Sequence, residues 1–489
     1  MSTKYQPTIG LEVHCILKTE TKMFCDCPNE PEDKEPNKNT CPVCLGHPGT
    51  LPTINKKAVE SVIRVGLALG GSISPVSKFD RKNYFYPDLP KGYQISQYDQ
   101  PLVLGGELRG IRIRRIHLEE DAGRLLHEMP GQTKKGEATF VDFNRAGVPL
   151  MELVTEPDLR SGEDTVEFAR ELQRILRYLG VSDADMEKGH LRIEANVSLS
   201  QMVNGEWQMN NKVELKNINS FRAVGLGIAY ELKRQEEILE SGGVVAHETR
   251  GWDEAGQKTV SQRSKEEAHD YRYFPEPDLP PFDTELFSPE ELRRSLPELP
   301  AQKRERFEKE FGLQSAQAAL LTDNPELADY FEECISELAT RDESTSSSVE
   351  KSGVILLFNY LTSDLAGLLV ESGISIRRSK VKPEHLAHLV DLIVDGKIMS
   401  RQAKDILKKV FETGTDPEDI MKDEGLETVS DDFAIEMVVK EVIAENSQAV
   451  KDYKDGKEAS MQFLVGKCMA KLKGRGNPAQ LKDLLTKLI

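Results

Sequence analysis

The stretch Ile9-Gly-Leu-Glu-Val-His-Cys-Ile-Leu17 decides how the first part of this chain folds. Its apolar side chains recur at every second position, and side chains two residues apart lie on the same face of a β-strand. The apolar residues from Leu11 to Cys15 therefore share one face, whereas Glu12 and His14 share the other. We expect a strand that buries its apolar face and presents a carboxylate beside an imidazole on the opposite face.

Further strands and helices are predicted along this part of the chain. Alternation predicts strands over residues 111–118 and 191–199. Apolar residues at helical spacing predict helices over residues 56–69 and 161–179. The second helix begins with Ser161 and Asp164, which resemble a capping box, and ends at Gly180.

The pattern changes after the proline-dense residues 274–281, for which we expect no regular structure. From about residue 288 it is typical of amphipathic helices, which we expect over 290–295, 301–311, 324–338, 353–370 and 383–395, with an exposed loop over 340–352. The sequence thus predicts an α+β protein: a mixed α/β domain over 1–290, an all-α domain over 291–408 and a small α-helical tail over 409–489.

Composition and charge narrow the possible functions. The chain has 489 residues, 38% of them hydrophobic, and a formal net charge of −18. It contains no run of about 18 apolar residues, so we expect no transmembrane helix. The N-terminus has the features of neither a signal peptide nor a transit peptide, which predicts a cytoplasmic location. The acidic balance argues against nucleic-acid binding, although a net charge does not describe how charge is distributed.

Four of the seven cysteines lie in two close pairs, Cys25-Asp-Cys27 and Cys41-Pro-Val-Cys44. The polar loop between the pairs is too hydrophilic to be held by burial alone. Zinc prefers tetrahedral thiolate coordination, so we interpret these residues as a structural zinc site with no open position for a substrate. The alternative is four free thiols.

Acidic residues also occur within apolar segments. Glu152 lies in the middle of Val148-Pro-Leu-Met-Glu-Leu-Val154, where a buried, unpaired charge would cost several kcal/mol. Glu119 ends a strand on the same side as Arg115 and His117. Carboxylates with a single imidazole suit Mg²⁺ or Mn²⁺. The alternative is that Glu12 and Glu152 form salt bridges with arginines such as Arg115 or Arg145, and that His14 only donates a hydrogen bond. The sequence has neither a Walker loop nor a GxGxxG motif after a strand.

Several ordered segments resemble the B-subunit family of the bacterial glutamyl/aspartyl-tRNA amidotransferases. They are Ile9-Gly-Leu-Glu-Val-His14, Phe79-Asp-Arg-Lys-Asn-Tyr-Phe-Tyr-Pro-Asp88, Gln94-Ile-Ser-Gln-Tyr-Asp-Gln-Pro101, His117-Leu-Glu-Glu-Asp-Ala-Gly123, Leu215-Lys-Asn-Ile-Asn-Ser-Phe221 and Asp270-Tyr-Arg-Tyr-Phe-Pro-Glu-Pro-Asp278. The resemblance covers nearly the whole chain. It implies that the first domain is a cradle holding a kinase and transamidase site, followed by a helical domain and a helical tail.

The resemblance also implies an activity. The family uses ATP to phosphorylate the side-chain carboxylate of Glu or Asp misloaded on tRNA(Gln) or tRNA(Asn), and ammonia then displaces the phosphate. Carried over to this sequence, the magnesium ligands are His14, Glu119 and Glu152, with Glu12 beside them as a second-metal or supporting residue. Zinc-bearing members of the family have a similar four-cysteine site. A separate glutaminase A subunit makes the ammonia, and a small C subunit completes the heterotrimer.

Other polar residues are candidate contacts to ATP, to the acceptor end of tRNA or to an ammonia channel, with solvated loops as the alternative for all but Arg192, Glu194 and Asn196. They are Lys82, Asn83, Tyr86, Asn144, Arg145, Arg192, Glu194, Asn196, Glu214 and Lys216.

Basic residues are concentrated at the end of the chain, where the resemblance implies contact with the body of tRNA. The candidate tRNA-binding residues are Lys467, Lys471, Lys473, Arg475 and Lys482. The alternative is an amphipathic helix with a solvated basic face. Two other functions remain open: a non-catalytic, zinc-stabilised RNA-binding subunit, and a metal-dependent phosphohydrolase that acts alone.

Overall fold

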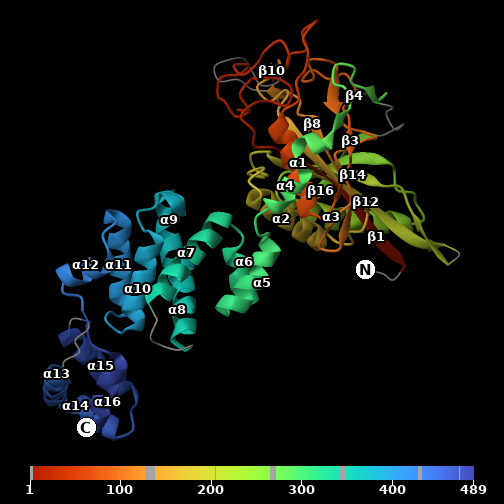
Figure 1. Cartoon of the computed structure of the whole chain (residues 1–489). Coiled ribbons are helices and arrows are strands. Elements are labelled where there is room, and N and C mark those ends of the chain that lie inside the picture. Colours follow the sequence, from red (N-terminus) through yellow and green to blue (C-terminus); the bar gives the residue numbers. More distant parts are fainter. Residues whose placement is uncertain are drawn as a thin grey trace. The chain divides into compact units, whose positions relative to one another are not determined.

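The computed structural model describes residues 4–126, 138–203, 205–264, 271–341, 348–427, 432–472 and 474–489. The chain forms two compact units, Met1–Pro300 and Ala301–Ile489. The first is mixed α/β and the second is helical, as Figure 1 shows. The predicted combination of a mixed N-terminal domain with a helical C-terminal region is therefore confirmed.

One large sheet forms the framework of the first unit. Its strand order is β16-β15-β14-β12-β1-β11-β8-β6-β2, with β13 paired to β12 and β7 to β8. Neighbours are antiparallel except for the β14–β15 pair. The strands are β1 (Tyr5–Ile16), β2 (Ser72–Ile73), β6 (Val103–Leu104), β7 (Glu107–Leu108), β8 (Ile111–Glu120), β11 (Pro149–Thr155), β12 (Leu191–Val203), β13 (Glu206–Met209), β14 (Val213–Ile218), β15 (Glu248–Asp253) and β16 (Lys258–Ser264).

Helices cover the apolar face of this sheet: α1 (Lys56–Ala68), α2 (Gly162–Tyr178) and α3 (Phe221–Glu240), with α4 (Pro289–Arg294) packed on α1 (Figure 1). Val13 from β1 and Leu172 from α2 belong to one core and are fully buried. The predicted start of α2 is confirmed, because the Asp164 N–H donates to Oγ of Ser161 at 3.0 Å. The helices leave the opposite, polar face of the sheet free for a site.

Three small sheets complete the unit. They consist of β3 (Val76–Ser77) with β18 (Phe282–Asp283), β9 (Arg124–Leu126) with β10 (Phe140–Asp142), and β17 (Phe274–Pro275) with β4 (Asp80–Asn83) and β5 (Tyr93–Ser96). The expectation of no regular structure over 274–281 is wrong for its first two residues, since Phe274 pairs with Arg81. Proline is compatible with an edge strand, and β17 lies at the edge of its sheet.

The second unit has two hydrophobic cores. The larger is formed by residues between Phe307 and Met421, and the smaller by residues between Ile435 and Leu485. The α-helices are α5 (Pro300–Phe311), α6 (Ser315–Leu321), α7 (Pro325–Arg341), α8 (Ser348–Asn359), α9 (Ala366–Ser372), α10 (Pro383–Val394), α11 (Ser400–Thr413), α12 (Pro417–Asp423), α13 (Asp432–Glu445), α14 (Ser447–Lys454), α15 (Ala459–Lys471) and α16 (Pro478–Leu488).

The predicted loop over 340–352 is shorter than expected. α7 extends to Arg341 and α8 begins at Ser348, so helix occupies both ends of that range. Residues 342–347 lie outside the described residues. The predicted helix over 353–370 includes a π-helical segment, Tyr360–Leu365, between α8 and α9.

In the described part of the chain, one helix, Ser352–Ser372, is long and apolar enough to cross a membrane by length and composition alone. The expectation that no such segment exists rested on uninterrupted apolar runs, and this helix contains Asn359 and Asp364. Leu357 and Leu361 are fully buried in the larger helical core. Such a helix is weak evidence for a membrane span, because the core helix of a soluble protein passes the same test.

Candidate functional site

The polar face of the large sheet brings charged residues from four strands into one row. The register sets His14 on β1 opposite Glu152 on β11 and Arg192 on β12, and it sets Glu152 opposite His117 on β8. Residues directly opposite one another project to the same side of a sheet. The four side chains therefore stand side by side.

Glu119 joins this row to form an acid–imidazole cluster with His14 and Glu152. His14 Nε2 lies 3.6 Å from Oε1 of Glu119 and 3.5 Å from Oε2 of Glu152. Potential ligand atoms of the three residues all lie within 4.8 Å of one another. His117 Nε2 is 3.3 Å from Glu152 Oε2, and the Ser96 hydroxyl is 3.2 Å from Glu119 Oε2. The residues expected to bind magnesium are close enough to share one ion.

Burial makes the charge of this cluster costly. Glu119 and Glu152 are 2% and 7% exposed. Burial of His14 disfavours its protonation, but its hydrogen bond to Glu152 and the charges of Glu152 and Glu119 outweigh burial and raise its pKa to about 9. Burial alone would raise the pKa of Glu152, but His117 and His14 hold it well below its usual value. The two buried carboxylates need positive charge nearby. Together with the imidazole nitrogen they form a ligand set that fits a hard divalent cation.

The alternative of arginine neutralisation receives no support from the geometry. Arg145 donates to the backbone oxygens of Ala122 and Gly123 at 3.1 and 2.7 Å. Arg192 Nη2 donates to Oδ2 of Asp121 at 2.9 Å. Within the described residues, the cationic partners of Glu152 are the two imidazoles rather than a guanidinium.

Two cations near the cluster form no ion pair with any described residue. Lys82 on β4 places Nζ 4.9 Å from the ring centroid of Tyr271. Burial disfavours its ammonium form, but the nearby negative charges, Glu119 first among them, outweigh burial and raise the pKa of Lys82. Arg115 on β8 has a buried Nε with no hydrogen-bond acceptor in the described part of the chain. Cations without carboxylate partners are suited to bind an anion such as phosphate.

A second acidic group lies further along the same face. Ligand atoms of Glu12, Glu194 and Glu214 lie within 4.8 Å of one another. Lys216 Nζ offsets part of this charge, at 2.9 Å from Glu194 and 3.4 Å from Glu214. Asn196 Nδ2 donates to Oε1 of Glu12 at 3.0 Å. The five predicted residues thus form one connected network on strands β1, β12 and β14.

Other predicted residues have contacts that hold the backbone. Asn144 is fully buried, accepts from the Asn39 N–H at 2.8 Å and donates to the Glu35 oxygen at 2.8 Å. Asn83 Nδ2 donates to the Arg272 oxygen at 2.8 Å. Tyr86, by contrast, is 59% exposed.

Sequence reasoning missed the aromatic wall beside Lys82. Tyr98 and Tyr273 stack with ring centroids 4.3 Å apart, and Tyr271 contacts Tyr273 edge-on at 6.2 Å. Burial raises the pKa of Tyr273 to about 12, so its hydroxyl stays protonated near neutral pH. The pairing of β4 with β17 and with β5 brings these residues to Lys82, and no local periodicity predicts it. The motif Asp270-Tyr-Arg-Tyr-Phe274 was the available signal.

The four cysteines of the predicted zinc site converge. Their sulfur atoms all lie within 4.8 Å of one another: those of Cys25, Cys27, Cys41 and Cys44. Sulfurs bound to one tetrahedral zinc ion are ~3.8 Å apart, given a Zn–S distance of ~2.3 Å. The Cys41 N–H also points at Sγ of Cys44 at 3.2 Å. Without metal, hydrogen bonding between Cys25 and Cys44 raises the pKa of Cys25 and lowers that of Cys44 to about 4. The donor set fits zinc.

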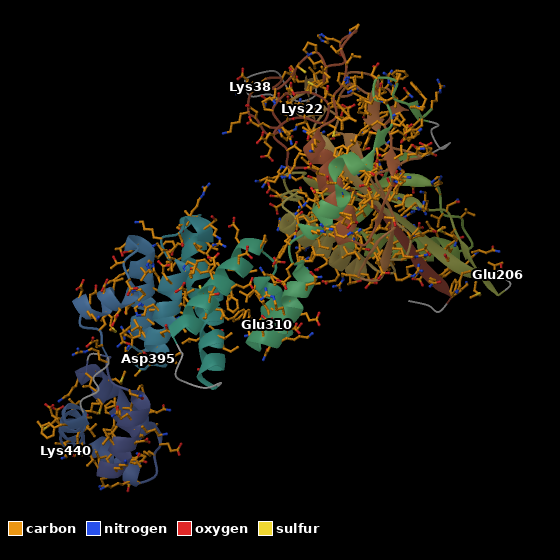
Figure 2. The ribbon with its side chains drawn as sticks, in the orientation of Figure 1. Lys22, Lys38, Glu206, Glu310, Asp395 and Lys440 are labelled. Carbon is orange, nitrogen blue, oxygen red and sulfur yellow. The ribbon has the colours of Figure 1, made fainter. Side chains whose placement is uncertain are left out.

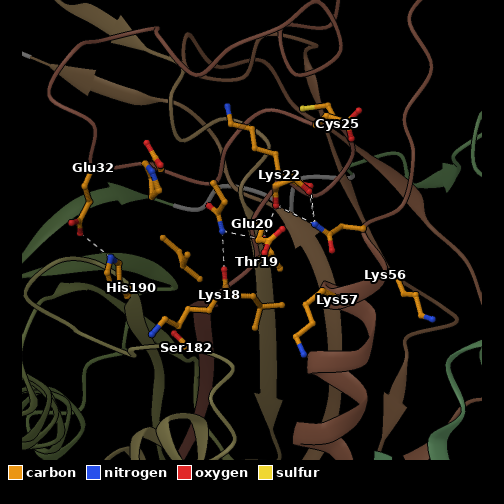
Figure 3. A pocket seen from close by; sticks show the side chains of 18 of the residues that line it. Lys18, Thr19, Glu20, Lys22, Cys25, Glu32, Lys56, Lys57, Ser182 and His190 are labelled. Carbon is orange, nitrogen blue, oxygen red and sulfur yellow. Dashed lines mark hydrogen bonds and ion pairs between the residues drawn. The ribbon is translucent and has the colours of Figure 1, made fainter. Parts of the chain in front are cut away.

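A cavity of about 990 Å³ lies beside the zinc cluster rather than at the acid–imidazole cluster. Figure 3 shows Lys22 and Cys25 toward one end of it, and Lys18 and Ser182 toward the other. None of the acid–imidazole residues His14, Glu119 and Glu152 lines this cavity.

The predicted tRNA-binding residues differ in their surroundings. Lys467 and Lys482 are exposed on α15 and α16. Lys471 is engaged by Glu441 at 2.8 Å and Glu445 at 2.7 Å. Arg475 donates to the Gly425 oxygen at 3.0 Å. Lys473 lies outside the described residues. Among these four described residues, Lys471 is therefore the one that pairs with acidic side chains.

Comparison with known proteins identifies relatives along the full chain. Residues 7–286 match the family model described as GatB/GatE catalytic domain, and residues 329–489 match the model described as GatB domain. The chain is 47% identical to the B subunit of the aspartyl/glutamyl-tRNA(Asn/Gln) amidotransferase from Caldicellulosiruptor saccharolyticus, with 99% of this chain and 98% of the relative covered. It is 46% identical to the protein of the same name from Persephonella marina, over 99% and 100% of the two chains, and 44% identical to that from a Picosynechococcus species, over 99% and 97%.

Proposed function

The chain belongs to the family of aspartyl/glutamyl-tRNA(Asn/Gln) amidotransferase B subunits, and we propose that it activates and amidates the amino acid of a misacylated tRNA. ATP phosphorylates the side-chain carboxylate of Glu-tRNA(Gln) or Asp-tRNA(Asn). Ammonia then displaces phosphate, giving Gln-tRNA(Gln) or Asn-tRNA(Asn). Activation comes first because a carboxylate has no leaving group for ammonia to displace.

The observation that carries this proposal is the meeting of opposite charges on the polar face. The acid–imidazole cluster of His14, Glu119 and Glu152 lies close to Lys82 and Arg115, which form no ion pair among the described residues. Phosphoryl transfer depends on positioning and charge neutralisation more than on covalent chemistry by the protein. A face that offers both metal ligands and cations meets that requirement.

The residues in and around the acid–imidazole cluster have separate roles in this reaction. Lys82 and Arg115 hold phosphoryl oxygens and keep the transferred group beside the acceptor carboxylate. His117 and Ser96 fix the carboxylates of Glu152 and Glu119 through contacts of 3.3 and 3.2 Å. A magnesium ion held by His14, Glu119 and Glu152 would neutralise phosphate charge.

Three parts of the proposal concern partners and zinc. Ammonia comes from a glutaminase A subunit, and a C subunit completes a heterotrimer with this chain. Zinc at the four cysteines has a structural role, because protein sulfurs fill all four positions. The exposed lysines of α15 and α16 contact the body of tRNA.

The test uses the heterotrimer with Glu152→Ala in this chain. We expect ADP formation that depends on misacylated tRNA, and amide formation, to fall roughly 100- to 1,000-fold, because one buried anionic group that organises the reaction centre is lost. The matched control is Glu167→Ala, since Glu167 is an exposed residue of α2. Both substrates, Glu-tRNA(Gln) and Asp-tRNA(Asn), are assayed in parallel.

Two results would contradict the proposal. Undiminished amide formation by Glu152→Ala would show that the acid–imidazole cluster takes no part in the reaction. It would favour a non-catalytic RNA-binding protein. ATP hydrolysis at the same rate with and without misacylated tRNA would instead favour an independent phosphohydrolase.

A further inference from the structure

Lys22 lies beside the zinc cluster and is completely buried. Its relative exposure is 0%, which is rare for lysine. Its Nζ lies 3.8 Å from Sγ of Cys44 and 3.2 Å from the backbone oxygen of Phe143. Figure 2 places it within the first unit. These are the polar contacts of its ammonium group among the described residues, and neither is a carboxylate.

Nearby ions do not neutralise Lys22. Glu120 approaches Gly147 from the same side, with Oε2 3.9 Å from the position a Cβ would occupy there. That carboxylate is already bound by Lys91 Nζ, at 2.6 and 2.7 Å from its two oxygens, and by the Ile95 N–H at 3.0 Å. A fully buried ammonium without a counter-charge is strongly destabilising. Something else at this position must supply negative charge.

A zinc ion with four thiolate ligands has that charge. Four sulfurs carrying one negative charge each and a divalent cation leave a net charge of about −2. We propose that Lys22 is the counter-cation of the zinc–thiolate cluster, with its ammonium group donating a hydrogen bond to the zinc-bound sulfur of Cys44. The negative charge of the cluster and the positive charge of Lys22 offset each other, so neither charge is buried without a partner.

This role also connects the zinc loop to the reaction centre. The Phe143 oxygen that receives Lys22 lies in the segment that leads into β11, which carries Glu152. In the same segment, Gly147 accepts the Met23 N–H at 2.8 Å and would place a Cβ 3.3 Å from that of Cys44. Lys22 therefore ties the thiolate cluster to the chain just before a strand of the polar face. The inference rests on the zinc assignment, not on the chemistry of the acid–imidazole cluster.

The test compares zinc binding by full-length wild type, Lys22→Met and Lys38→Met. Methionine keeps the length of the side chain and removes its charge. Lys38, labelled in Figure 2, is the matched control, because it lies between the two cysteine pairs but is exposed and paired with Asp33 at 3.0 Å. Zinc content is measured by elemental analysis, and affinity by competition with a chromophoric chelator. We expect Lys22→Met to weaken zinc binding roughly 10- to 100-fold, as loss of a supporting contact to a metal ligand does, and Lys38→Met to leave it unchanged.

Thermal unfolding with and without zinc separates this role from simple packing. Without zinc, Lys22→Met should be closer in stability to wild type, since the zinc–thiolate charge of about −2 that Lys22 offsets is then absent. With zinc, it should be less stable than wild type. An equal loss of stability with and without zinc would show that Lys22 contributes only its hydrogen bond to Phe143, and would overturn the proposal. If elemental analysis finds no zinc in the wild-type protein, the zinc assignment itself is refuted.

A second pair of variants applies if Lys22→Met does not fold. Lys22→Arg keeps the charge, whereas Lys22→Gln keeps a hydrogen-bond donor without charge. Tighter zinc binding by the arginine variant supports the proposal, and equal binding by the two variants overturns it.

Discussion

Lys82 shows how a single residue acquires a role from its surroundings. In the sequence it is one basic residue in a polar stretch, next to Arg81. In the structure Arg81 forms a double hydrogen bond with Glu276, with both contacts at 2.7 Å, whereas Lys82 forms no ion pair among the described residues and faces the aromatic wall. The neighbouring cation is therefore structural, and Lys82 remains available for an anion.

Replacement of Lys82 tests that availability. We expect Lys82→Met to lower kcat/KM for ATP roughly 10- to 100-fold, because a hydrogen bond to a charged group contributes about 1.5–3 kcal/mol. The measurement is ADP formation by the heterotrimer in the presence of misacylated tRNA. Lys233→Met is the control, since Lys233 lies on α3 with 77% of its side chain exposed. An unchanged kcat/KM in Lys82→Met would exclude a phosphate contact.

Among the elements, β1 determines the site because it pairs with both β11 and β12. A shift of one residue in the β1–β11 register would move His14 to the apolar side of its partner strand. The burial of Val13 and Cys15 in the core opposes such a shift. The same apolar residues that stabilise the fold therefore hold His14 opposite Glu152.

Helix α10 provides an element whose stability depends on pH. The Lys382 N–H donates to Nδ1 of His385 at 3.4 Å at the start of this helix. Burial lowers the pKa of His385 below 6.5, while Glu384 and Asp416 oppose this change and Lys382 adds to it. Near and below pH 6.5 the unfolded chain binds this proton more readily than the folded chain. Its contribution to stability is therefore complete above about pH 6.5 and declines as the pH falls through the folded pKa.

We expect the hydrogen-exchange protection of α10 in the full chain to decrease between about pH 7 and pH 5, after correction for intrinsic exchange rates. His385→Gln removes the titration, and its amide oxygen can still accept the Lys382 N–H. The protection of α10 in this variant should change less over that range. The same pH response in both proteins would show that another group is responsible. Asp416 has a lowered pKa, so its own contribution is lost only at more acidic pH.

At the scale of the whole molecule, the C-terminal tail is best defined by its core. The boundary predicted at residues 408 and 409 falls inside α11. Val410, Ile420 and Met421 belong to the larger helical core, and Leu426 packs against it. We propose that the tail consists of the helices α13 to α16 around the smaller core. A truncation that removes only this tail ends after Leu426.

Removal of residues 427–489 should weaken tRNA binding by the heterotrimer and reduce its dependence on salt, because lysine contacts to phosphates are lost. Glutaminase activity of the partner should persist. Binding is measured over a series of salt concentrations. The double substitution Lys467→Met and Lys482→Met in the full chain separates charge from folding, with a decrease in the salt slope of about one per phosphate contact. Unchanged affinity of the truncated protein would exclude a tRNA-binding tail.

The sequence by itself determined the local structure and the family. Alternation placed Glu12 and His14 on one face of β1, and the capping residue Ser161 marked the start of α2, because these properties depend on neighbours in the chain. The close cysteine pairs indicated a metal site for the same reason. The long segments shared with the B-subunit family identified the chain without any knowledge of its fold.

Only the tertiary structure decided which charges meet. Strand pairing sets Glu152 between His14 and His117, although these residues are far apart in the sequence. In the folded chain Arg145 donates to a backbone oxygen and Arg192 to Asp121. Lys82 forms no ion pair among the described residues, and Lys22 is buried against Cys44. The energy of a charge depends on its burial and on the nearest opposite charge. Both are properties of residues brought together by folding, so local sequence cannot specify them.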